Sequence, residues 1–339
     1  MEPHQTSLQE GWRSAGPASS GEQVMGHIME STGINSMQPN RARWRELKEQ
    51  LLLTFSPKLR GKKVVYLDYP LHLNLGDLLI YKGTLTLLEE LGAQVEMSFS
   101  TSNADRFFRT RIPEDWVLLL HGGGNFGDIY SIHQALREKV IKHFPNNPIL
   151  IMPQSVHFNE PETFLQNCSL YREHKNLKMY VRDQESFNFM SQALTPEQLL
   201  MAPDMATMLI DEWTWPQQMP ERTLMFRRKD CESVSGADAV EDAFDWNSLY
   251  TSMDMKKFRL FNRVSGLERK HDINLFTSPL WVRFSNALIN RAVNFYQNYG
   301  QVDTDRLHGA ILALLLGKSV LLSDNCYNKI DRYMRCWLV

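Results

Sequence analysis

From Lys62 onward, short runs of strand length alternate with longer segments whose apolar residues recur at helical spacing. The short runs are KVVYLDY, QVEMSF, WVLLL, NPILIMPQS, KMYVRD and LLMAPDMA, and DLLIYKGTLTLLEELG between the first two is amphipathic. Strands that alternate with helices are typical of crossover units, which build parallel sheets. We therefore expect an α/β fold.

The alternation of short apolar runs and helical segments is interrupted between residues 211 and 222, where the stretch DEWTWPQQMPER contains two prolines. It continues after residue 222. TLMFRR, QVDTD and SVLLSD predict further strands, and helices are expected from about Leu280 to Tyr299 and from about Arg306 to Gly317. The first 40 residues have little apolar periodicity, whereas RARWRELKEQLLLTF has helical spacing. We therefore expect a mobile tail (1–40), an N-terminal lobe (41–210) and a C-terminal lobe (211–339), each lobe with a parallel sheet.

Length, charge and cysteine content narrow the class of protein. At 339 residues the chain exceeds the size at which one hydrophobic core stops growing, which agrees with two lobes. Lys and Arg number 37 against 39 Asp and Glu, so a net charge of -2 gives no global attraction to nucleic acid or an anionic membrane, and any anion site must be local. The N-terminus lacks the pattern of a secretory signal and no apolar run has transmembrane length, which favours a cytoplasmic protein. The four cysteines have none of the paired spacings of a zinc or redox site.

Residues directly after the predicted strands are the candidates for chemistry, because ligands bind beyond the carboxyl ends of the strands in parallel α/β sheets. In DYPLHLNLGD, Asp77 is either the N-cap of a helix that begins at Leu78 or a general base or ligand of a substrate hydroxyl. In LLLHGGGNFGD, the glycines indicate close approach of the backbone to a ligand or to another segment, without the spacing of a Rossmann fingerprint or a P-loop. His121 before them is either an interior histidine or an acid/base of a pocket.

Two further strand ends carry cations. In MFRRKDCE, Arg227 and Arg228 form either a solvated rim or a fork that grips a carboxylate or phosphate. In VDTDRLHG, a strand ends in Thr304 and Asp305 and a helix begins at about Arg306, so that Arg306 and His308 occupy its first turn. The unpaired N–H groups and positive dipole end of a helix favour an anion there, although an arginine in this position also occurs as a plain surface feature.

Taken together, these segments resemble the polysaccharide pyruvyl transferase family. The resemblance runs from about Lys62 to the end and rests on these segments, in this order: NLGD, LHGGGNFGD, IMPQS, YVRDQES, APDMA, FRRKD, TDRLHG and SDNCYNKIDRY. It implies two Rossmann-like lobes with parallel sheets, similar to the GT-B glycosyltransferases, with the site in the cleft between the lobes. It also implies transfer of pyruvate from phosphoenolpyruvate to a sugar, usually as a cyclic ketal across two hydroxyls.

By this resemblance the C-terminal lobe holds the donor and the N-terminal lobe faces the acceptor. The residues expected at the donor are Thr304, Arg306, Leu307 and His308, with either Arg227 or Arg228. The residues expected to face the acceptor are Asn74, Gly76, Asp77, Gly122, Gly123, Gly124, Asn125 and Asp128. Ketal formation requires a general acid and a general base, for which we expect His308 as acid or phosphate-stabilising donor and Asp77 or His121 as base. Phosphoenolpyruvate is a co-substrate, and no metal or other cofactor is expected.

The expected partners are phosphoenolpyruvate and a glycan or lipid-linked oligosaccharide of exopolysaccharide assembly, with no nucleic acid and no integral membrane segment. Contact with a membrane is expected only peripherally, through a lipid-linked substrate. An alternative is a GT-B-type glycosyltransferase that binds the diphosphate of a nucleotide sugar with Arg306 and His308, and a third is a sugar-binding protein without catalysis. Trp213, Trp215 and Trp246 either stack on sugar rings or pack in the core.

Overall fold

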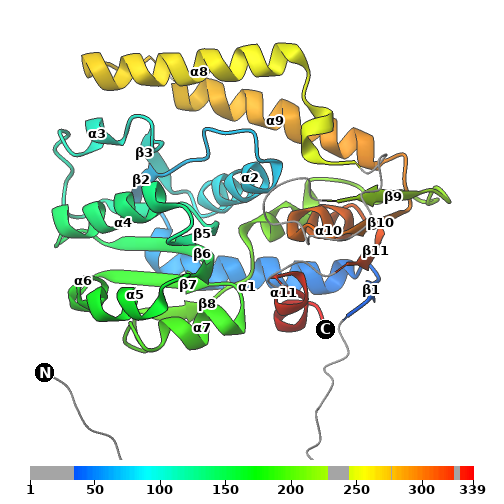
Figure 1. Ribbon diagram of the computed structural model, residues 1–339, viewed down its shortest axis with the longest axis horizontal. Coiled ribbons are helices and arrows are strands. Elements are labelled where there is room, and N and C mark those ends of the chain that lie inside the picture. Colours follow the sequence, from blue (N-terminus) through cyan, green and yellow to red (C-terminus); the bar gives the residue numbers. More distant parts are fainter. Residues whose placement is uncertain (1–33, 228–243, 276, 324–328) are drawn as a thin grey trace, which may run out of the picture. The chain divides into compact units, whose positions relative to one another are not determined.

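Two sheets with helices packed against them organise the part of the chain that the structure describes (Figure 1). The computed structural model describes residues 34–227, 244–275, 277–323 and 329–339. Within these ranges, seven strands form one sheet and four strands form the other. The expected α/β class with parallel sheets is confirmed.

The seven-stranded sheet is parallel throughout and has the order β3-β2-β4-β6-β7-β8, with β5 paired to β6. Its strands are β2 (Lys63–Leu67), β3 (Gln94–Phe99), β4 (Val117–Leu120), β5 (Gly123–Gly127), β6 (Ile149–His157), β7 (Leu177–Val181) and β8 (Leu199–Met201). The sequence predicts a loop across the glycine run, whereas the structure has strand β5 there. The glycines permit this close pairing, since a β-carbon at Gly127, whose φ is 147°, would lie 1.6 Å from the carbonyl oxygen of His157.

The order of this sheet reverses at β2 and β4, which are neighbours. Doubly wound α/β proteins bind ligands in the crevice beyond the strand ends at such a switch point. Asp68 directly follows β2 and His121 directly follows β4, and the His121 N–H donates to the carbonyl of Leu67 at 3.1 Å. Asp68 has a φ of 63°, a left-handed conformation that is uncommon outside glycine. The topology therefore gathers both residues where a ligand site is expected.

The four-stranded sheet has the order β1-β11-β10-β9. Its strands are β1 (Ser36–Met37), β9 (Thr223–Phe226), β10 (Gln301–Thr304) and β11 (Ser319–Leu322). The last three are mutually parallel, and β1 pairs antiparallel with β11. The sequence places the first ordered element at Arg41. The structure has an earlier two-residue strand, which is too short to show an alternating pattern.

Eleven α-helices and two 3-10 helices occur within the described residues. They are α1 (Arg41–Leu59), α2 (Leu75–Glu90), α3 (Ala104–Phe107), α4 (Ser131–His143), α5 (Pro161–Asn167), α6 (Ser169–Glu173), α7 (Gln184–Met190), α8 (Ser252–His271), α9 (Thr277–Tyr296), α10 (Leu307–Leu315) and α11 (Lys329–Trp337), with the 3-10 helices η1 (Met205–Asp211) and η2 (Trp246–Leu249). In the described ranges no helix is both long enough and apolar enough to cross a bilayer. Helix α8 was not predicted from the sequence, and the helix expected from Leu280 begins at Thr277.

Two apolar clusters cover opposite faces of the seven-stranded sheet. Along β2, Val64 and Tyr66 belong to one cluster, and Val65 and Leu67 belong to the other. A parallel strand buried on both faces has a continuous apolar sequence, as KVVYL does. The cluster around Val64 continues through α1, α2 and α10 to β9, β10 and β11, so the two sheets share apolar packing.

Candidate functional site

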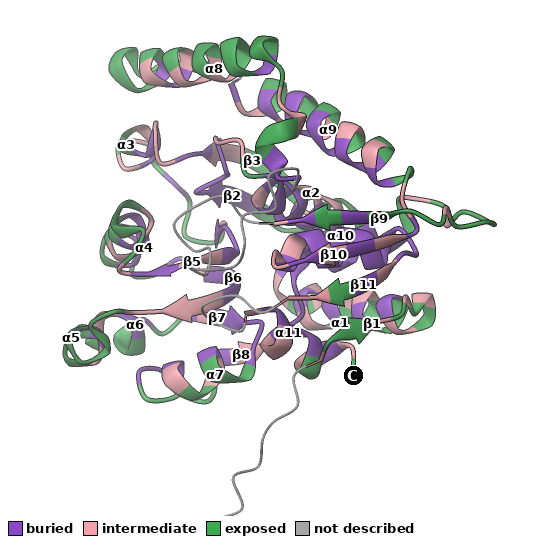
Figure 2. Cartoon of the chain, turned by 45° about the vertical axis from the view of Figure 1, so that its right-hand side comes forward, coloured by how far each residue is buried: buried purple, intermediate pink, exposed green. Residues whose placement is uncertain are grey.

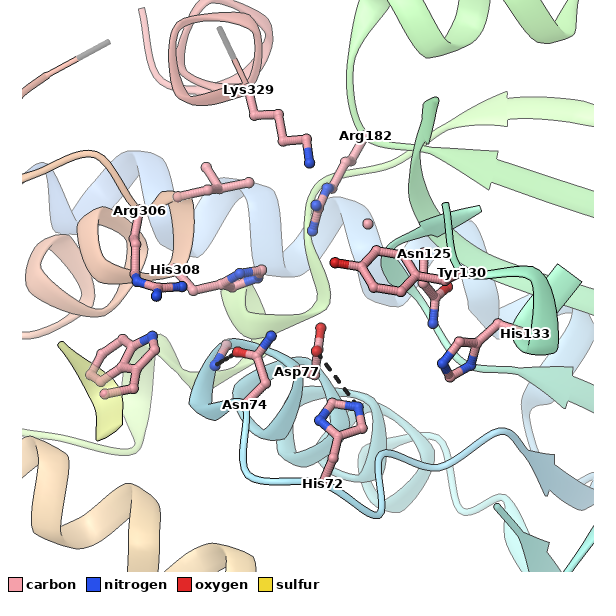
Figure 3. A pocket seen from close by; sticks show the side chains of 14 residues that line it. His72, Asn74, Asp77, Asn125, Tyr130, His133, Arg182, Arg306, His308 and Lys329 are labelled. Atoms are coloured by element: carbon pink, nitrogen blue, oxygen red, sulfur yellow. Dashed lines mark hydrogen bonds and ion pairs between the residues drawn. The ribbon is translucent and has the colours of Figure 1, made fainter. Parts of the chain in front are cut away.

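A pocket with a cavity volume of about 300 Å³ opens beside the first turns of α2 and α10 (Figure 3). Residues that follow strands of both sheets line it. The lining residues are His72, Asn74, Gly76, Asp77, Gly124, Asn125, Tyr130, His133, Arg182, Trp246, Arg306, Leu307, His308 and Lys329. Pockets of this size hold small ligands.

The pocket contains about half of the site residues predicted from the sequence. Those that line it are Asn74, Gly76, Asp77, Gly124, Asn125, Arg306, Leu307 and His308. Those that lie elsewhere in the described structure are His121, Gly122, Gly123, Asp128, Arg227 and Thr304. Arg228 lies outside the described residues.

Helix α10 begins at the pocket with Arg306 as its N-cap residue. The Arg306 side chain makes no capping hydrogen bond here, and the first N–H groups of a helix and its positive dipole end favour an anion. The Thr304 hydroxyl accepts a hydrogen bond from the Arg306 N–H at 3.0 Å and thereby fixes the turn between β10 and α10. The expected position of Arg306 and His308 at a helix start is confirmed.

Buried carboxylates hold both arginines and His308 of the pocket. Arg306 Nη2 lies 2.8 Å from Asp245 Oδ2, and Asp245 is 2% exposed. Arg182 and His308 share Asp204, which forms an ion pair with Arg182 and lies 3.2 Å from His308 Nε2. These contacts restrict the directions in which the guanidinium and imidazole groups can point.

Asp204 remains ionised although it is buried. Burial alone would raise its pKa, but His308, Arg182 and the N–H of Ala206 favour the charged form and hold the pKa of this carboxyl well below its usual range. An ionised Asp204 favours a proton on His308 Nε2, so that Nδ1 is the other ring nitrogen available for chemistry.

Gly76 lies directly against His308. A β-carbon on Gly76 would meet His308 Nδ1 at 2.8 Å, and real β-carbons do not approach other atoms so closely. Gly76 is the second residue of α2, whose N-cap is Asn74, and the Asn74 side chain accepts from the Gly76 N–H at 3.1 Å. The absence of a side chain at position 76 therefore lets the first turn of α2 contact the first turn of α10.

Asp77 does not cap α2, so the sequence-based interpretation of Asp77 as an N-cap residue is wrong. The helix begins at Leu75 rather than Leu78 because Asn74 supplies the cap. Asp77 Oδ2 lies 3.7 Å from His72 Nε2, and both side chains line the pocket (Figure 3). Its carboxylate is 25% exposed and is therefore within reach of a ligand.

His121 has the surroundings of an interior histidine. It is 2% exposed, lies 2.8 Å from the Tyr66 hydroxyl through Nδ1, and does not line the pocket. Burial lowers its pKa to about 4, and the negative charges of Asp77 and Asp68 only partly oppose this shift. His121 is therefore uncharged at neutral pH.

The remaining predicted residues have partners away from the pocket. The Asp128 carboxylate accepts from the N–H groups of Asn159 and Glu160 at 2.8 and 3.0 Å, ahead of α5. Arg227 Nη2 lies 2.7 Å from Asp303 Oδ2 on the neighbouring strand. These contacts stabilise local structure.

Several residues at the pocket were not predicted from the sequence. Arg182 directly follows β7, Asp204 follows β8 and Asp68 follows β2, so the strand-end rule would have found all three. His133 Nδ1 lies 2.8 Å from Asp68, and His133 lines the pocket. Only the folded chain brings these two together, because they are 65 residues apart.

Of the three tryptophans considered as sugar-stacking residues, Trp246 lines the pocket. It is 4% exposed and packs edge-on against Phe226 at a centroid distance of 4.4 Å, so most of its ring belongs to the core. Trp215 is away from the pocket and donates through Nε1 to the carbonyl of Leu315 at 2.9 Å. Trp213 packs against the apolar cluster that contains Val64.

The described residues contain no group of three or more His, Cys, Asp or Glu side chains arranged to hold a metal ion. Cys168 and Cys336 are free thiols, and the other two cysteines of the sequence lie outside the described ranges.

Comparison with known proteins adds information that the geometry cannot supply. A family model described as polysaccharide pyruvyl transferase matches residues 74–327. The Bacillus subtilis protein EpsO, named a putative pyruvyl transferase, is 32% identical over 298 residues, which cover 86% of this chain and 90% of EpsO. Pyruvyl transferase 1 of Schizosaccharomyces pombe is 29% identical over 314 residues, covering 86% of this chain and 74% of that protein.

A solved structure shares the fold. The crystal structure of an uncharacterized protein from Klebsiella pneumoniae matches with a TM-score of 0.59 and 20% identity, covering 86% of this chain and 94% of that chain. At this identity the likeness concerns the fold alone.

Proposed function

Because the chain belongs to the polysaccharide pyruvyl transferase family, we propose that it moves pyruvate from phosphoenolpyruvate onto a sugar of an exopolysaccharide or its lipid-linked precursor. The product is a cyclic ketal, and phosphate is released. One observation supports this proposal most: Arg182, Arg306 and Lys329 surround a single small pocket at the start of α10. Phosphoenolpyruvate is a compact ligand with several negative charges, which such a pocket suits.

Directed hydrogen-bond donors, more than net charge, would recognise the donor substrate. The lining contains three permanent cations and one carboxylate, Asp77. Asp204 and Asp245 behind the arginines offset part of the positive charge but fix the guanidinium groups. Planar guanidinium forks bind carboxylate and phosphate in a bidentate manner, so orientation matters as much as charge.

The size of the pocket favours phosphoenolpyruvate over a nucleotide sugar. Its volume of about 300 Å³ is at the lower end of the range for ligand pockets. A nucleotide sugar also carries a base and a ribose, for which this volume leaves little room. The glycosyltransferase alternative therefore has less support than pyruvyl transfer.

In the proposed reaction, protonated His308 delivers a proton to the methylene carbon of phosphoenolpyruvate, and a sugar hydroxyl forms a bond to the adjacent carbon. Asp77 accepts the proton of that hydroxyl. Phosphate then leaves with the electron pair of its C–O bond, and a second hydroxyl closes the ring and loses its proton. Of the two hydroxyl protons, one balances the proton added to carbon and the other leaves with phosphate. His121 is the less suitable base because it is buried away from the pocket.

We also propose that the two lobes of a GT-B-like arrangement bind different substrates, as expected from the sequence. The C-terminal lobe (211–339) would hold the donor through Arg306, Leu307 and His308, with Arg182 of the N-terminal lobe (41–210) as a further contact. The N-terminal lobe would receive the acceptor beside Asp77 and Asn125. The pocket would then be the cleft between the lobes, which the origin of its lining residues supports. Phosphoenolpyruvate serves as co-substrate, and the mechanism uses no further cofactor.

Calorimetric titration with phosphoenolpyruvate tests the donor. We expect saturable binding by the intact protein, loss of binding in Arg182→Ala, and unchanged binding in Arg111→Ala, an exposed arginine away from the pocket. UDP-glucose titrated in parallel tests the alternative. Binding of UDP-glucose without binding of phosphoenolpyruvate would replace the proposal with glycosyl transfer.

A further inference from the structure

Helix α8 exposes a face on which cations and leucines alternate. Lys256, Leu260, Arg263, Leu267 and Lys270 follow one another at spacings of four and three residues, which places them on one side of a helix. All five are exposed, including Leu260 at 59% and Leu267 at 46%. Figure 2 shows α8 with a largely exposed surface. We call these five residues the α8 basic face.

The acidic residues of α8 lie on its opposite, buried side. Asp254 forms an ion pair with Arg291 and completes the capping box with Thr251. Glu268 accepts hydrogen bonds from the Asn103 side chain at 2.9 Å and from the Leu275 N–H at 2.9 Å. Both carboxylates are therefore used inside the protein, and no acidic residue of α8, all of which is described, is exposed.

The cations of the α8 basic face have no ion-pair partner among the described residues. Lys257, Arg259 and Arg269 are also exposed on α8 and add to the positive charge. A local basic surface on a protein with a net charge of -2 concentrates positive charge at one place. Such a surface complements an anionic partner.

The leucines indicate what kind of anionic partner fits. Nucleic acid would pair with the cations but would leave Leu260 and Leu267 in water. A second copy of the chain would pack these leucines together, because they are seven residues apart, but would then bring Lys256, Arg263 and Lys270 against their own counterparts. An anionic lipid surface satisfies both residue types, since its headgroups attract cations and its acyl boundary accepts leucine.

We propose that the α8 basic face docks this protein on the surface of an anionic lipid bilayer. Leu260 and Leu267 enter the boundary between headgroups and acyl chains, and the three cations contact lipid phosphates. The assignment rests on the surface of α8 and holds whatever reaction the pocket performs.

Short segments of the chain connect helix α8, which carries the α8 basic face, to the pocket. Trp246 lines the pocket and begins η2, which ends two residues before Thr251, the N-cap of α8. After α8 the chain enters α9, where Trp281 Nε1 donates to the carbonyl of Pro70 at 2.8 Å, next to the loop that carries His72. If the acceptor is lipid-linked, which rests on the proposed function, docking through α8 would hold the pocket at the membrane where that acceptor is anchored.

Vesicle flotation tests the proposal with the full chain. We expect binding to vesicles of mixed phosphatidylglycerol and phosphatidylcholine, weak binding to phosphatidylcholine alone, and loss of binding as salt is raised. The variant K256Q/R263Q/K270Q is expected to bind the anionic vesicles about a hundredfold more weakly, at roughly fivefold for each cation removed. The matched control K62Q/K142Q/K175Q removes three exposed lysines elsewhere and is expected to bind like the unmodified protein.

The variant L260S/L267S separates the apolar contribution from the charge. We expect weaker vesicle binding with an unchanged dependence on salt, because the cations remain. Equal binding of the unmodified protein to both vesicle types would overturn the proposal. An equal loss of vesicle binding in K256Q/R263Q/K270Q and in the control K62Q/K142Q/K175Q would also overturn it. So would a dimer, seen by analytical ultracentrifugation, that L260S/L267S dissociates, because the face would then bind a second copy.

Phosphoenolpyruvate binding, measured on the same variants, keeps the two proposals apart. The α8 substitutions lie outside the pocket and are expected to leave donor binding unchanged. A protein that binds phosphoenolpyruvate but not vesicles contradicts the docking proposal alone. A protein that binds vesicles but not phosphoenolpyruvate contradicts the proposed function alone.

Discussion

Gly76 and His308 contact each other so closely that a β-carbon on Gly76 would stand 2.8 Å from Nδ1 of the histidine. Gly76 belongs to the first turn of α2 and His308 to the first turn of α10, which follow strands of different sheets. Asp204 holds the other ring nitrogen of His308 at 3.2 Å. The imidazole is therefore positioned from both sides, by the surface of a glycine and by a buried carboxylate.

Substitution Gly76→Ala is expected to displace the His308 ring and to lower turnover. A displacement of about 1 Å at a reacting group can reduce the rate about a hundredfold, so we expect a fall of that order in kcat/KM. The control Gly266→Ala lies in α8, where the added methyl group would meet no other atom within 4 Å, and should leave turnover unchanged. Steady-state phosphate release measures both variants, and unchanged turnover in Gly76→Ala would show that the position of His308 does not matter.

Substitution Arg306→Lys is expected to weaken phosphoenolpyruvate binding about tenfold to a hundredfold. Lysine keeps the charge but loses the fork, and a hydrogen bond to a charged group contributes about 1.5–3 kcal/mol. The matched control is Arg227→Lys, since Arg227 pairs with Asp303 away from the pocket. Calorimetry gives both dissociation constants. A weakened Arg227→Lys beside an unaffected Arg306→Lys would move the donor site to the end of β9.

The start of α10 could be predicted from the sequence because all its determinants are local. A strand, a short turn and a strongly apolar helix follow one another in QVDTDRLHGAILALLLG, so the sequence alone places Arg306 and His308 at the start of the helix. The directions of their side chains depend on Asp245 and Asp204, which are distant in sequence. The α/β class was predictable for the same reason.

Other parts of the pocket depend on contacts between distant segments. Asp68 and His133 meet only because β2 lies beside β4 and α4 follows β5. The spacing of residues in the sequence does not predict this contact between Asp68 and His133. The glycine run was predicted as a loop, because the pairing of β5 with β6 cannot be inferred from the composition of β5 alone. Helix α8 did have a local signal that could have predicted it, the capping box between Thr251 and Asp254.

Substitution Asp77→Asn distinguishes the two candidate bases. If Asp77 accepts the hydroxyl proton, we expect turnover to fall about a hundredfold to ten-thousandfold, while phosphoenolpyruvate binding remains. His121→Gln is expected to change turnover far less, because His121 is buried outside the pocket. Phosphate release and calorimetry on both variants test this. The reverse order of effects would assign the base to His121.

The buried His121 is expected to make stability depend on pH. Its pKa is lowered to about 4 in the folded protein, whereas an unperturbed histidine titrates near about 6.5. As the pH falls between these two values the unfolded chain binds a proton that the folded protein does not, so the stabilisation is complete above the higher value and is lost toward the lower one. The full loss is about 3 kcal/mol. His121→Gln cannot titrate, so its free energy of unfolding should fall less over that range by about this amount. Urea unfolding of the unmodified protein and of His121→Gln at about pH 7.5 and about pH 4 measures the difference. If both proteins lose the same free energy of unfolding between these pH values, the pKa of His121 is not lowered in the folded protein.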